Sequence, residues 1–368
     1  MSSTTNYDMK NYNKILNQYL QNKDKLFLAN QLIFLLDFST PDNLLHSKII
    51  LENKLIRDIY SEGEEVDACD LRIIFFSFLK NKKQNELIKQ LSLKKYQLIP
   101  HILTDIDDTL FPNPINIKYI NFSGKDTSWL KNKPYPGIKS FYKCFYNNIS
   151  FNPAKYSTIL TATPEFLKKR RFDDKNINEI LGKNFGFLSG KESKIQALWD
   201  SILGTYKGYG ILSPEPNSLA KTKFTKFKQY KILFPEYKLI FIGDNGQGDL
   251  IAGFKMIKYD PNCLVFIHNL YVNNEYIFDK KKINSYKQKR LYFFDNYLSL
   301  SSLFLKFKLI TKRDFNIIKK SFISDINKVG NWLNYKLYSQ YIVKKTKKYC
   351  HKSSKQITYN KRTQIHKY

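Results

Sequence analysis

Short apolar runs that end in polar turns recur through the middle of this chain. Residues 98–103 and 238–242 are mostly apolar runs of strand length, and each leads directly into a cluster of carboxylates. Residues 156–160 lead into small hydroxyl residues, and residues 264–267 form a further apolar run. Helical patterns lie between these runs, and such alternation over residues 96–300 favours a parallel sheet flanked by helices. The sequence therefore predicts an α/β domain over this region.

The flanking regions carry other patterns. Residues 1–95 are mostly helical in character and predict an N-terminal helical arm. Its helix candidates are Lys25–Phe38, Leu71–Leu79 and Glu86–Leu93. Residues 301–342 predict C-terminal helices. Residues 343–368 are rich in Lys and Arg, have no acidic residue and few aliphatic ones, and are expected to be disordered.

The first carboxylate cluster follows residues 98–103. Asp105, Asp107 and Asp108 stand at the tip of this predicted strand. Carboxylates packed together repel one another, so a divalent cation is the usual reason for such a cluster, with one carboxylate free to act as a nucleophile. The alternative is a solvated acidic turn after a strand.

A second carboxylate cluster follows the predicted strand at residues 238–242. Gly243 allows a sharp turn, and Asp244 and Asp249 stand close behind it. In an open parallel sheet, ligands bind at the carboxyl ends of the strands, so Asp244 is expected to meet the first cluster. Carboxylate oxygens of this kind suit Mg²⁺. The alternative is a glycine-rich turn in which an aspartate supports the loop.

Two further segments bring polar groups to the same edge. Thr161 follows a predicted strand and offers a hydroxyl and a backbone N–H there, or serves as an N-cap or turn residue. Pro164 and Glu165 suit the first turn of a following helix. Residues 220–228 predict the start of a helix that runs towards Phe234. One of its lysines is placed to reach a phosphate group, while most of them form its solvated face.

These segments, in this order, resemble the haloacid-dehalogenase-like phosphatase superfamily. Asp105-x-Asp107-x-Thr109 is similar to its first motif, Thr161 to its second, a lysine to its third, and Gly243-Asp244 with Asp249 to its fourth. The resemblance implies a Rossmannoid parallel sheet flanked by helices.

A finer pattern looks like the catalytic domain of the actin-patch phosphatidate phosphatase family. The segments that carry this pattern are Asp105–Thr109, Tyr135–Gly137, Thr161–Pro164, Phe234-Pro235 and Ile242–Asp249. The resemblance covers roughly residues 95–320. The chain departs from the family at Asn245, where the family usually has Ser, and in Leu250–Gly253. These departures bear on the identity of the substrate more than on the type of reaction.

The resemblance implies a role for each residue of the first and fourth motifs. Asp105 would attack phosphorus and form an aspartyl-phosphate, and Asp107 would protonate the leaving oxygen and then activate water. Mg²⁺ would be held by the Asp105 carboxylate, the Asp107 backbone carbonyl and Asp244. Asp249 would orient this shell or complete it through water.

The other implied residues bind phosphate or support the site. Thr161, Ala162 and a lysine would bind the phosphoryl oxygens and stabilise charge in the transition state. Aligned on Pro235, that lysine is Lys223, with Lys221 and Lys226 close enough to remain alternatives. The residues with supporting roles are Asp108, Thr109, Gly243 and Asn245.

Two segments of the central region are expected to surround the site. Residues 110–155 contain aromatic residues and the turn Pro134–Gly137, and they predict a flap or small cap. Residues 183–219 contain several glycines and prolines and predict a loop-rich stretch near its mouth.

Composition points to an anionic partner. The formal net charge is +29, from 61 basic and 32 acidic residues. The partner that this charge suggests is an anionic membrane, nucleic acid or a phosphorylated substrate. Compositional drift in an AT-rich genome would also account for the excess of basic residues. The cluster Lys344–Lys348 in the tail suits peripheral contact with anionic lipid or contact with nucleic acid.

The remaining composition favours a cytoplasmic enzyme. The four cysteines have neither zinc-ligand nor redox spacing, and the sequence shows no apolar signal region and no membrane span.

Three functions stay open. The first is a Mg²⁺-dependent phosphatase, with phosphatidate or a related lipid phosphate as the substrate that the resemblance implies. The second is a phosphatase for nucleic-acid ends or nucleotides, and the third is a non-catalytic binding module on the same fold.

Overall fold

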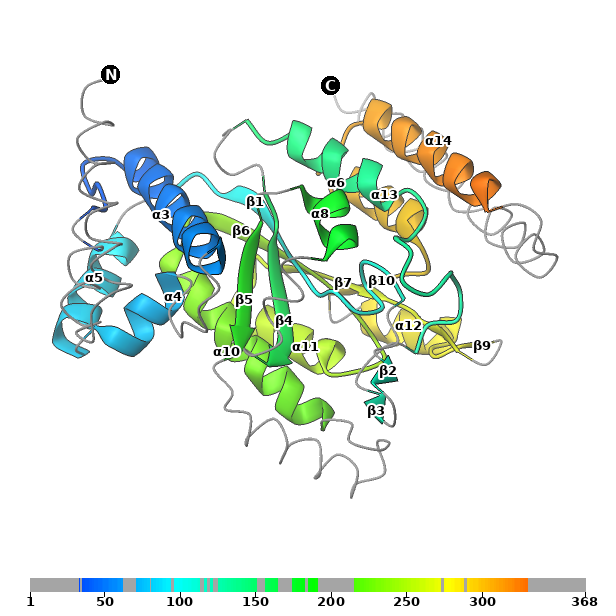
Figure 1. The fold of residues 1–368 in the computed structure, drawn as a ribbon, viewed down its shortest axis with the longest axis horizontal. Helices are drawn as coiled ribbons and strands as arrows, with labels where there is room; N and C mark the ends of the chain where they lie inside the picture. The colour runs from blue at the N-terminus through cyan, green and yellow to red at the C-terminus, as the bar shows by residue number, and fades with distance from the viewer. Residues whose placement is uncertain are drawn as a thin grey trace, which may run out of the picture.

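The computed structural model contains a central β-sheet with helices around it (Figure 1). The described residues are 33, 35–61, 71–79, 81–93, 96–112, 116–117, 120–121, 125–150, 156–164, 174–182, 185–190, 215–272, 275–287 and 290–329. The predictions for most of residues 1–34 and for the basic tail at residues 343–368 lie outside this range.

A six-stranded parallel sheet forms the centre of the molecule (Figure 1). Its strands in spatial order are β10 (Leu291–Phe294), β7 (Leu264–His268), β6 (Tyr237–Asp244), β1 (Ile99–Thr104), β4 (Thr158–Pro164) and β5 (Gly186–Gly190). All neighbouring strands pair in parallel. The chain builds β1, β4 and β5 outward and then returns to add β6, β7 and β10 on the other side of β1. The predicted α/β fold with a parallel sheet is therefore confirmed.

The apolar runs become strands because helices cover both faces of the sheet. Figure 1 shows α10 and α11 on one side and α6, α13 and α14 on the other. The bounds of these helices are Pro216–Leu233 for α10, Asp249–Tyr259 for α11, Ile138–Asn147 for α6, Tyr297–Lys306 for α13 and Lys312–Lys328 for α14. Two shorter helices, α8 (Lys175–Leu181) and α12 (Lys280–Lys287), pack against α6 and β10 respectively. A strand buried on both faces is apolar at consecutive positions, as in the buried run Leu239–Ile242 of β6.

The described part of the N-terminal region is helical. It contains α3 (Pro41–Ser61), α4 (Leu71–Ile73), the π-helix η1 (Ile74–Phe78) and α5 (Asn81–Leu93). α3 contacts β5, and α4 and α5 contact α10. The helix predicted to end at Phe38 ends earlier, because Asp37 instead accepts a hydrogen bond from the Ser39 amide at 2.8 Å. This turn leads the chain into α3.

One connection differs from the sequence prediction. Within residues 183–219, which were expected to be loop-rich, residues 186–190 form the edge strand β5 and residues 216–219 begin α10. The strand signal is weak because Gly186 and Gly190 leave only a short apolar core. Gly186 is required there, since a Cβ would overlap the Thr158 side chain of β4.

Two hairpins lie in the connections that leave the carboxyl ends of strands. β2 (Asn116–Ile117) and β3 (Ile120–Asn121) pair after β1, and β8 (Tyr271–Val272) and β9 (Glu275–Tyr276) pair after β7. The segment predicted as a flap thus contains the first hairpin and α6. Among the described residues, no helix has the length and apolar character needed to cross a bilayer.

A buried histidine lies among aromatic rings in β1. His101 is fully buried, and its ring stacks on Tyr237 with centroids 4.2 Å apart. Its Nε2 lies 2.9 Å from Thr158 Oγ1 and 3.2 Å from the Tyr230 hydroxyl. Burial lowers the pKa of His101 to about 3, so the folded state holds this ring neutral.

We expect His101 to make the fold sensitive to acid. Between pH 6.5 and 3 the unfolded chain binds a proton at His101 that the folded chain does not, so stability falls as the pH decreases, by about 1.4 kcal/mol per unit. We expect His101→Phe to retain the ring stacking, and the Thr158 and Tyr230 hydroxyl oxygens, which lie 3.1 Å apart in the wild type, to keep each other as partners. Urea unfolding at pH 7 and pH 5 should show a loss about 2 kcal/mol larger in the wild type than in His101→Phe. Equal losses in the two proteins would contradict the assignment.

Candidate functional site

The parallel pairing of β1 and β6 brings two aspartates to one edge of the sheet. Thr104 pairs with Ile242, and the Asp105 amide donates to the Ile242 carbonyl at 2.9 Å. Asp105 and Asp244 therefore leave neighbouring strands at their carboxyl ends. The order in which the strands were added reverses between β1 and β6, and such a switch point is where open α/β sheets bind ligands.

A third aspartate completes a buried carboxylate group. Asp249 is the first residue of α11, and one side-chain oxygen from each of Asp105, Asp244 and Asp249 lies within 4.8 Å of the others. The exposed fractions of the three residues are 5%, 1% and 0%. Gly243 makes the close approach possible, since a Cβ there would overlap the Asp249 carboxylate. We refer to these three residues as the carboxylate triad.

Lys223 lies against the carboxylate triad. Lys223 Nζ is 2.9 Å from Asp105 Oδ1 and also donates to Asp249 Oδ1. Burial alone lowers the pKa of Lys223, but the neighbouring aspartates outweigh it and raise that pKa above its ordinary value. Of the three lysines that the sequence left open, Lys223 is therefore the one that reaches the triad.

The two alternative lysines have other positions. Lys226 is buried one turn further along α10, and its ammonium donates to the Thr161 carbonyl at 2.7 Å. Lys221 is exposed. Residues three apart lie on one face of a helix, which explains why Lys223 and Lys226 both point into the protein.

The segment expected to bind phosphate leaves β4 at the same edge. Ile159 pairs with Thr104, and Thr161 is buried two residues further on. The pairing with β5 shifts register between Leu160 and Pro164, so the strand bulges where the chain passes Thr161. The backbone of Ala162 belongs to this bulged part of β4. Bulges of this kind often reposition groups next to active sites.

The helix expected to begin at Pro164 does not begin there. Pro164 is the last residue of β4 and pairs with Gly190. The bulge lets the chain continue its pairing beyond Thr161, and a proline is tolerated at a strand end, where its missing N–H is not needed. Glu165 lies outside the described residues.

The remaining residues of the first motif surround the carboxylate triad without joining it. Asp107 is half-buried, and its side chain is not part of the triad. Asp108 adopts a left-handed conformation with φ 57°, and its Oδ2 accepts from the Lys125 amide at 2.5 Å. Burial raises the pKa of Asp108 to about 8. Thr109 is buried, and its hydroxyl has no hydrogen-bond partner among the described residues.

Asn245 holds the loop that follows β6. Its Oδ1 accepts from the Leu270 amide at 3.0 Å, and its Nδ2 donates to Asn269 Oδ1 at 2.8 Å. These bonds tie the Asp244 loop to the chain that leaves β7. Asn245 therefore supports the loop through its side chain.

Sequence reasoning did not find a buried aspartate beside the site. Asp126 accepts from the Ser128 amide at 3.1 Å and the Tyr271 amide at 3.0 Å through Oδ1, and from the Tyr135 hydroxyl at 2.6 Å through Oδ2. The spacing Asp126-x-Ser128 is typical of an Asx turn and was the available local signal. His268 was also missed, and its Nδ1 lies 2.7 Å from the Asp108 carbonyl.

The electrostatics of the carboxylate triad favour an additional cation. Burial, opposed by Lys223, raises the pKa of Asp105 to about 7. Burial together with the neighbouring aspartates raises the pKa of Asp244 well above its usual range. If all three carboxylates were ionised, Lys223 would offset only one of their charges, and two negative charges would be left uncompensated in a buried place.

The donor set fits a hard divalent cation. Asp244 Oδ1 accepts from the Gly246 amide at 2.6 Å, whereas Asp244 Oδ2 is buried and has no hydrogen-bond partner among the described residues. The side-chain atoms that the triad offers to a metal are all carboxylate oxygens, the ligands preferred by Mg²⁺. In the described part of the chain, this is the one group of acidic, histidine or cysteine side chains close enough to hold a metal.

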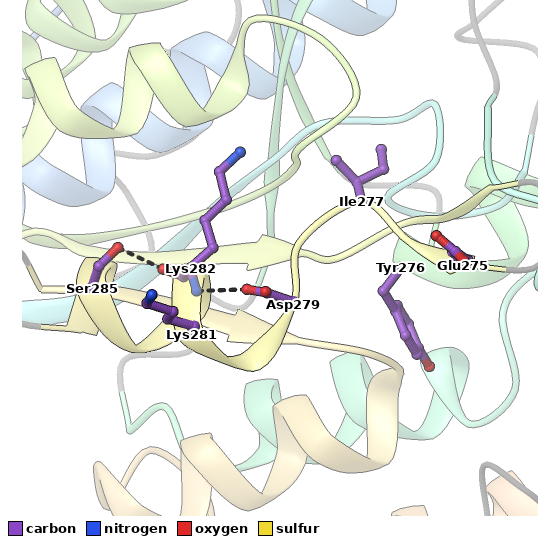
Figure 2. Close-up of a pocket in the computed structure, with 7 residues that line it drawn as sticks. All are labelled: Glu275, Tyr276, Ile277, Asp279, Lys281, Lys282 and Ser285. Carbon is purple, nitrogen blue, oxygen red and sulfur yellow. Dashed lines mark hydrogen bonds between the residues drawn. The ribbon is translucent and has the colours of Figure 1, made fainter.

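A separate shallow pocket lies beside β9 and α12 (Figure 2). Its volume is about 590 Å³, and it is lined by Glu275–Ile277, Asp279, Lys281, Lys282 and Ser285. Two acids and two lysines give it no single sign of charge. It shares no residue with the carboxylate triad.

Comparison with known proteins adds no relationship. A scan against protein-family models, a search of curated proteins and a search of solved structures found no match for this chain.

Proposed function

We propose that this chain is a Mg²⁺-dependent phosphomonoesterase of the haloacid-dehalogenase-like type, which acts through an aspartyl-phosphate on Asp105. The observation that carries the proposal is the meeting of Asp105, Asp244 and Asp249 with Lys223 at the carboxyl edge of a parallel sheet. Buried carboxylates are costly, so their convergence at a switch point is easier to explain by a bound cation and an anionic substrate than by stability alone.

The proposal assigns one role to each group. Asp105, the Asp107 backbone carbonyl and Asp244 hold Mg²⁺, and Asp249 orients this set while it accepts from Lys223. The bound ion supplies positive charge that offsets the negative charge of the substrate phosphate. Lys223, Thr161 and the backbone at Ala162 bind phosphoryl oxygens.

The reaction then proceeds in two displacements. An Asp105 carboxylate oxygen attacks phosphorus, the bond from phosphorus to the leaving oxygen breaks, and Asp107 gives that oxygen a proton. Water next attacks the phosphorus of the aspartyl-phosphate while Asp107 takes up its proton, and inorganic phosphate leaves with Asp105 restored. Asp107 suits this exchange because it is half-buried and keeps access to solvent.

The finer part of the proposal concerns the substrate. Phosphatidate or a related lipid phosphate follows from the resemblance to the actin-patch phosphatidate phosphatase family. Phosphorylated nucleic-acid ends or nucleotides follow from the net charge of +29. A binding module without turnover is disfavoured, since an abandoned site has no physical need for buried carboxylates.

Phosphate release with Mg²⁺ and with a chelator tests the proposal. The substrate panel is phosphatidate, lysophosphatidate, nucleotides, 3′-phosphorylated oligonucleotides and an aryl phosphate. We expect release that requires Mg²⁺, and the preferred compound decides between lipid and nucleic acid.

Thermal unfolding tests metal binding without turnover. At a hundred times its dissociation constant, Mg²⁺ should stabilise the wild type by about 2.7 kcal/mol and should stabilise Asp244→Asn much less. A protein that releases no phosphate from any compound and shows no Mg²⁺-dependent stabilisation would contradict the proposal.

A further inference from the structure

Lys125 lies at the rim of the carboxylate triad. Its side chain is exposed, and its ammonium donates to the Gly246 carbonyl at 3.0 Å. Gly246 also donates its amide to Asp244 Oδ1 at 2.6 Å. One residue of the β6 loop therefore binds Asp244 through its N–H and Lys125 through its carbonyl.

The distances around Gly246 show how close the two side chains are. A Cβ built on Gly246 would lie 3.1 Å from Asp244 Oδ1 and 3.6 Å from Lys125 Cδ. Both side chains therefore border the same small volume. The Lys125 side chain follows the loop that carries Asp244, on its solvent-exposed side, whereas Lys223 is buried.

The backbone at Lys125 is held on several sides. Its amide donates to Asp108 Oδ2 at 2.5 Å, which ties it to the loop after β1. The next residue, Asp126, is buried and accepts from the Tyr271 amide, and the Thr127 amide donates to the Tyr271 carbonyl at 2.8 Å. A lysine on such a fixed backbone loses less conformational freedom on binding than one on a free loop.

The Lys125 ammonium also has binding capacity left. Among the residues that the structure describes, no carboxylate forms an ion pair with it, and its one hydrogen bond goes to a neutral carbonyl. An ammonium group has three donors, so two of them are available to an anion.

We propose that Lys125 is a specificity-determining residue that binds a second anionic group of the substrate, outside the phosphoryl group that reacts at Asp105. This inference rests on the proposed phosphomonoesterase function. The substrate class is a phosphomonoester whose leaving group carries a further phosphate or carboxylate, which favours a nucleotide or nucleic-acid end over phosphatidate, whose diacylglycerol leaving group is uncharged. Lys223 serves the reacting phosphoryl group, and Lys125 serves the rest of the molecule.

Steady-state kinetics with two matched substrates test this role. The substrates are propyl phosphate and the bisphosphate of propanediol, which differ by the second phosphate. We expect the wild type to have a KM about tenfold lower for the bisphosphate, a factor typical of one charge-assisted hydrogen bond. Lys125→Met should abolish this preference and leave kcat for propyl phosphate unchanged, whereas Lys125→Arg should retain it.

A matched control separates position from overall charge. Lys131 is an exposed lysine of the same segment, and Lys131→Met removes the same charge. The Lys131 variant should keep the preference. An equal loss in both variants would overturn the proposal, as would an unchanged preference in Lys125→Met or a fall in kcat for both substrates, which would indicate a purely structural role.

A binding measurement keeps the inference testable if no turnover is found. Calorimetry in the presence of Mg²⁺ would compare pyrophosphate with orthophosphate for the wild type and the same variants. Tighter binding of pyrophosphate that is lost in Lys125→Met alone supports the role of Lys125 even if the proposed reaction fails. A wild type that binds both anions equally, or neither, would overturn it.

Discussion

Replacing Asp105 with asparagine is expected to lower phosphate release by at least roughly a thousandfold. The carboxamide has nearly the same shape but does not act as a nucleophile towards phosphorus. Asp105 is buried at the carboxyl end of β1, beside the start of the Asp244 loop, and it is the carboxylate to which the proposal assigns the attack on phosphorus.

The fold of Asp105→Asn should remain intact. Burial raises the pKa of Asp105, so removal of this charge relieves a desolvation cost, and Lys223 keeps Asp249 as a partner. Phosphate release is measured on the preferred substrate, with Asp279→Asn as the control, because Asp279 is an exposed aspartate at the start of α12. Turnover within tenfold of the wild type in Asp105→Asn would remove Asp105 from the role of nucleophile.

Replacing Lys48 with methionine is expected to destabilise the fold by about 3–5 kcal/mol. Lys48 of α3 donates to Glu236 Oε1 at 2.5 Å and to the Leu233 carbonyl at 2.7 Å, and its ammonium lies 5.0 Å from the centre of the Phe234 ring. Lys48 and Glu236 are almost completely buried. Burial lowers the pKa of Lys48 to about 8 and raises that of Glu236, so each charge depends on the other.

Loss of the lysine would leave Glu236 buried without its partner. The free energy of unfolding is measured in urea for Lys48→Met, for Glu236→Leu and for the double variant. The double variant should recover most of the loss, because two apolar residues leave no uncompensated charge. The control is Lys139→Met, which breaks the exposed pair with Glu179 and should cost at most about 1 kcal/mol. Equal losses in Lys48→Met and Lys139→Met would show that the buried pair contributes no more to the free energy of unfolding than the exposed pair.

The strands that carry the candidate site could be predicted because their signals are local. An apolar run such as Leu239–Ile242 is apolar at consecutive positions for the same reason that it is buried on both faces. The polar residues that follow it are then at a strand end. Parallel topology brings such ends to one edge, so the approach of Asp105 and Asp244 followed from the strand pattern.

Weaker local signals failed. The edge strand β5 contains two glycines in five residues, and its pairing with β4 supplies most of the reason for its conformation. The bulge of β4 likewise depends on the register with β5, so the sequence suggested a helix start at Pro164 where the strand continues.

The choice among the lysines of α10 depended on tertiary structure. Lys221, Lys223 and Lys226 lie within two turns of one helix, and the sequence pattern does not determine how far that helix is rotated about its axis. Packing of α10 against β4 and α11 sets this rotation. It directs Lys223 to the carboxylates and Lys226 to the Thr161 carbonyl, and leaves Lys221 in solvent.

By itself, the sequence determined the parallel α/β core and the two carboxylate clusters, since hydrophobic periodicity and strand ends are properties of neighbouring residues. Only the tertiary structure decided that Lys223 lies against Asp105 and Asp249, that Lys125 contacts the Asp244 loop, and that Asp126 contacts the chain that leaves β7. These contacts join residues far apart in the chain, and they form only when the sheet, α10 and the loops pack together.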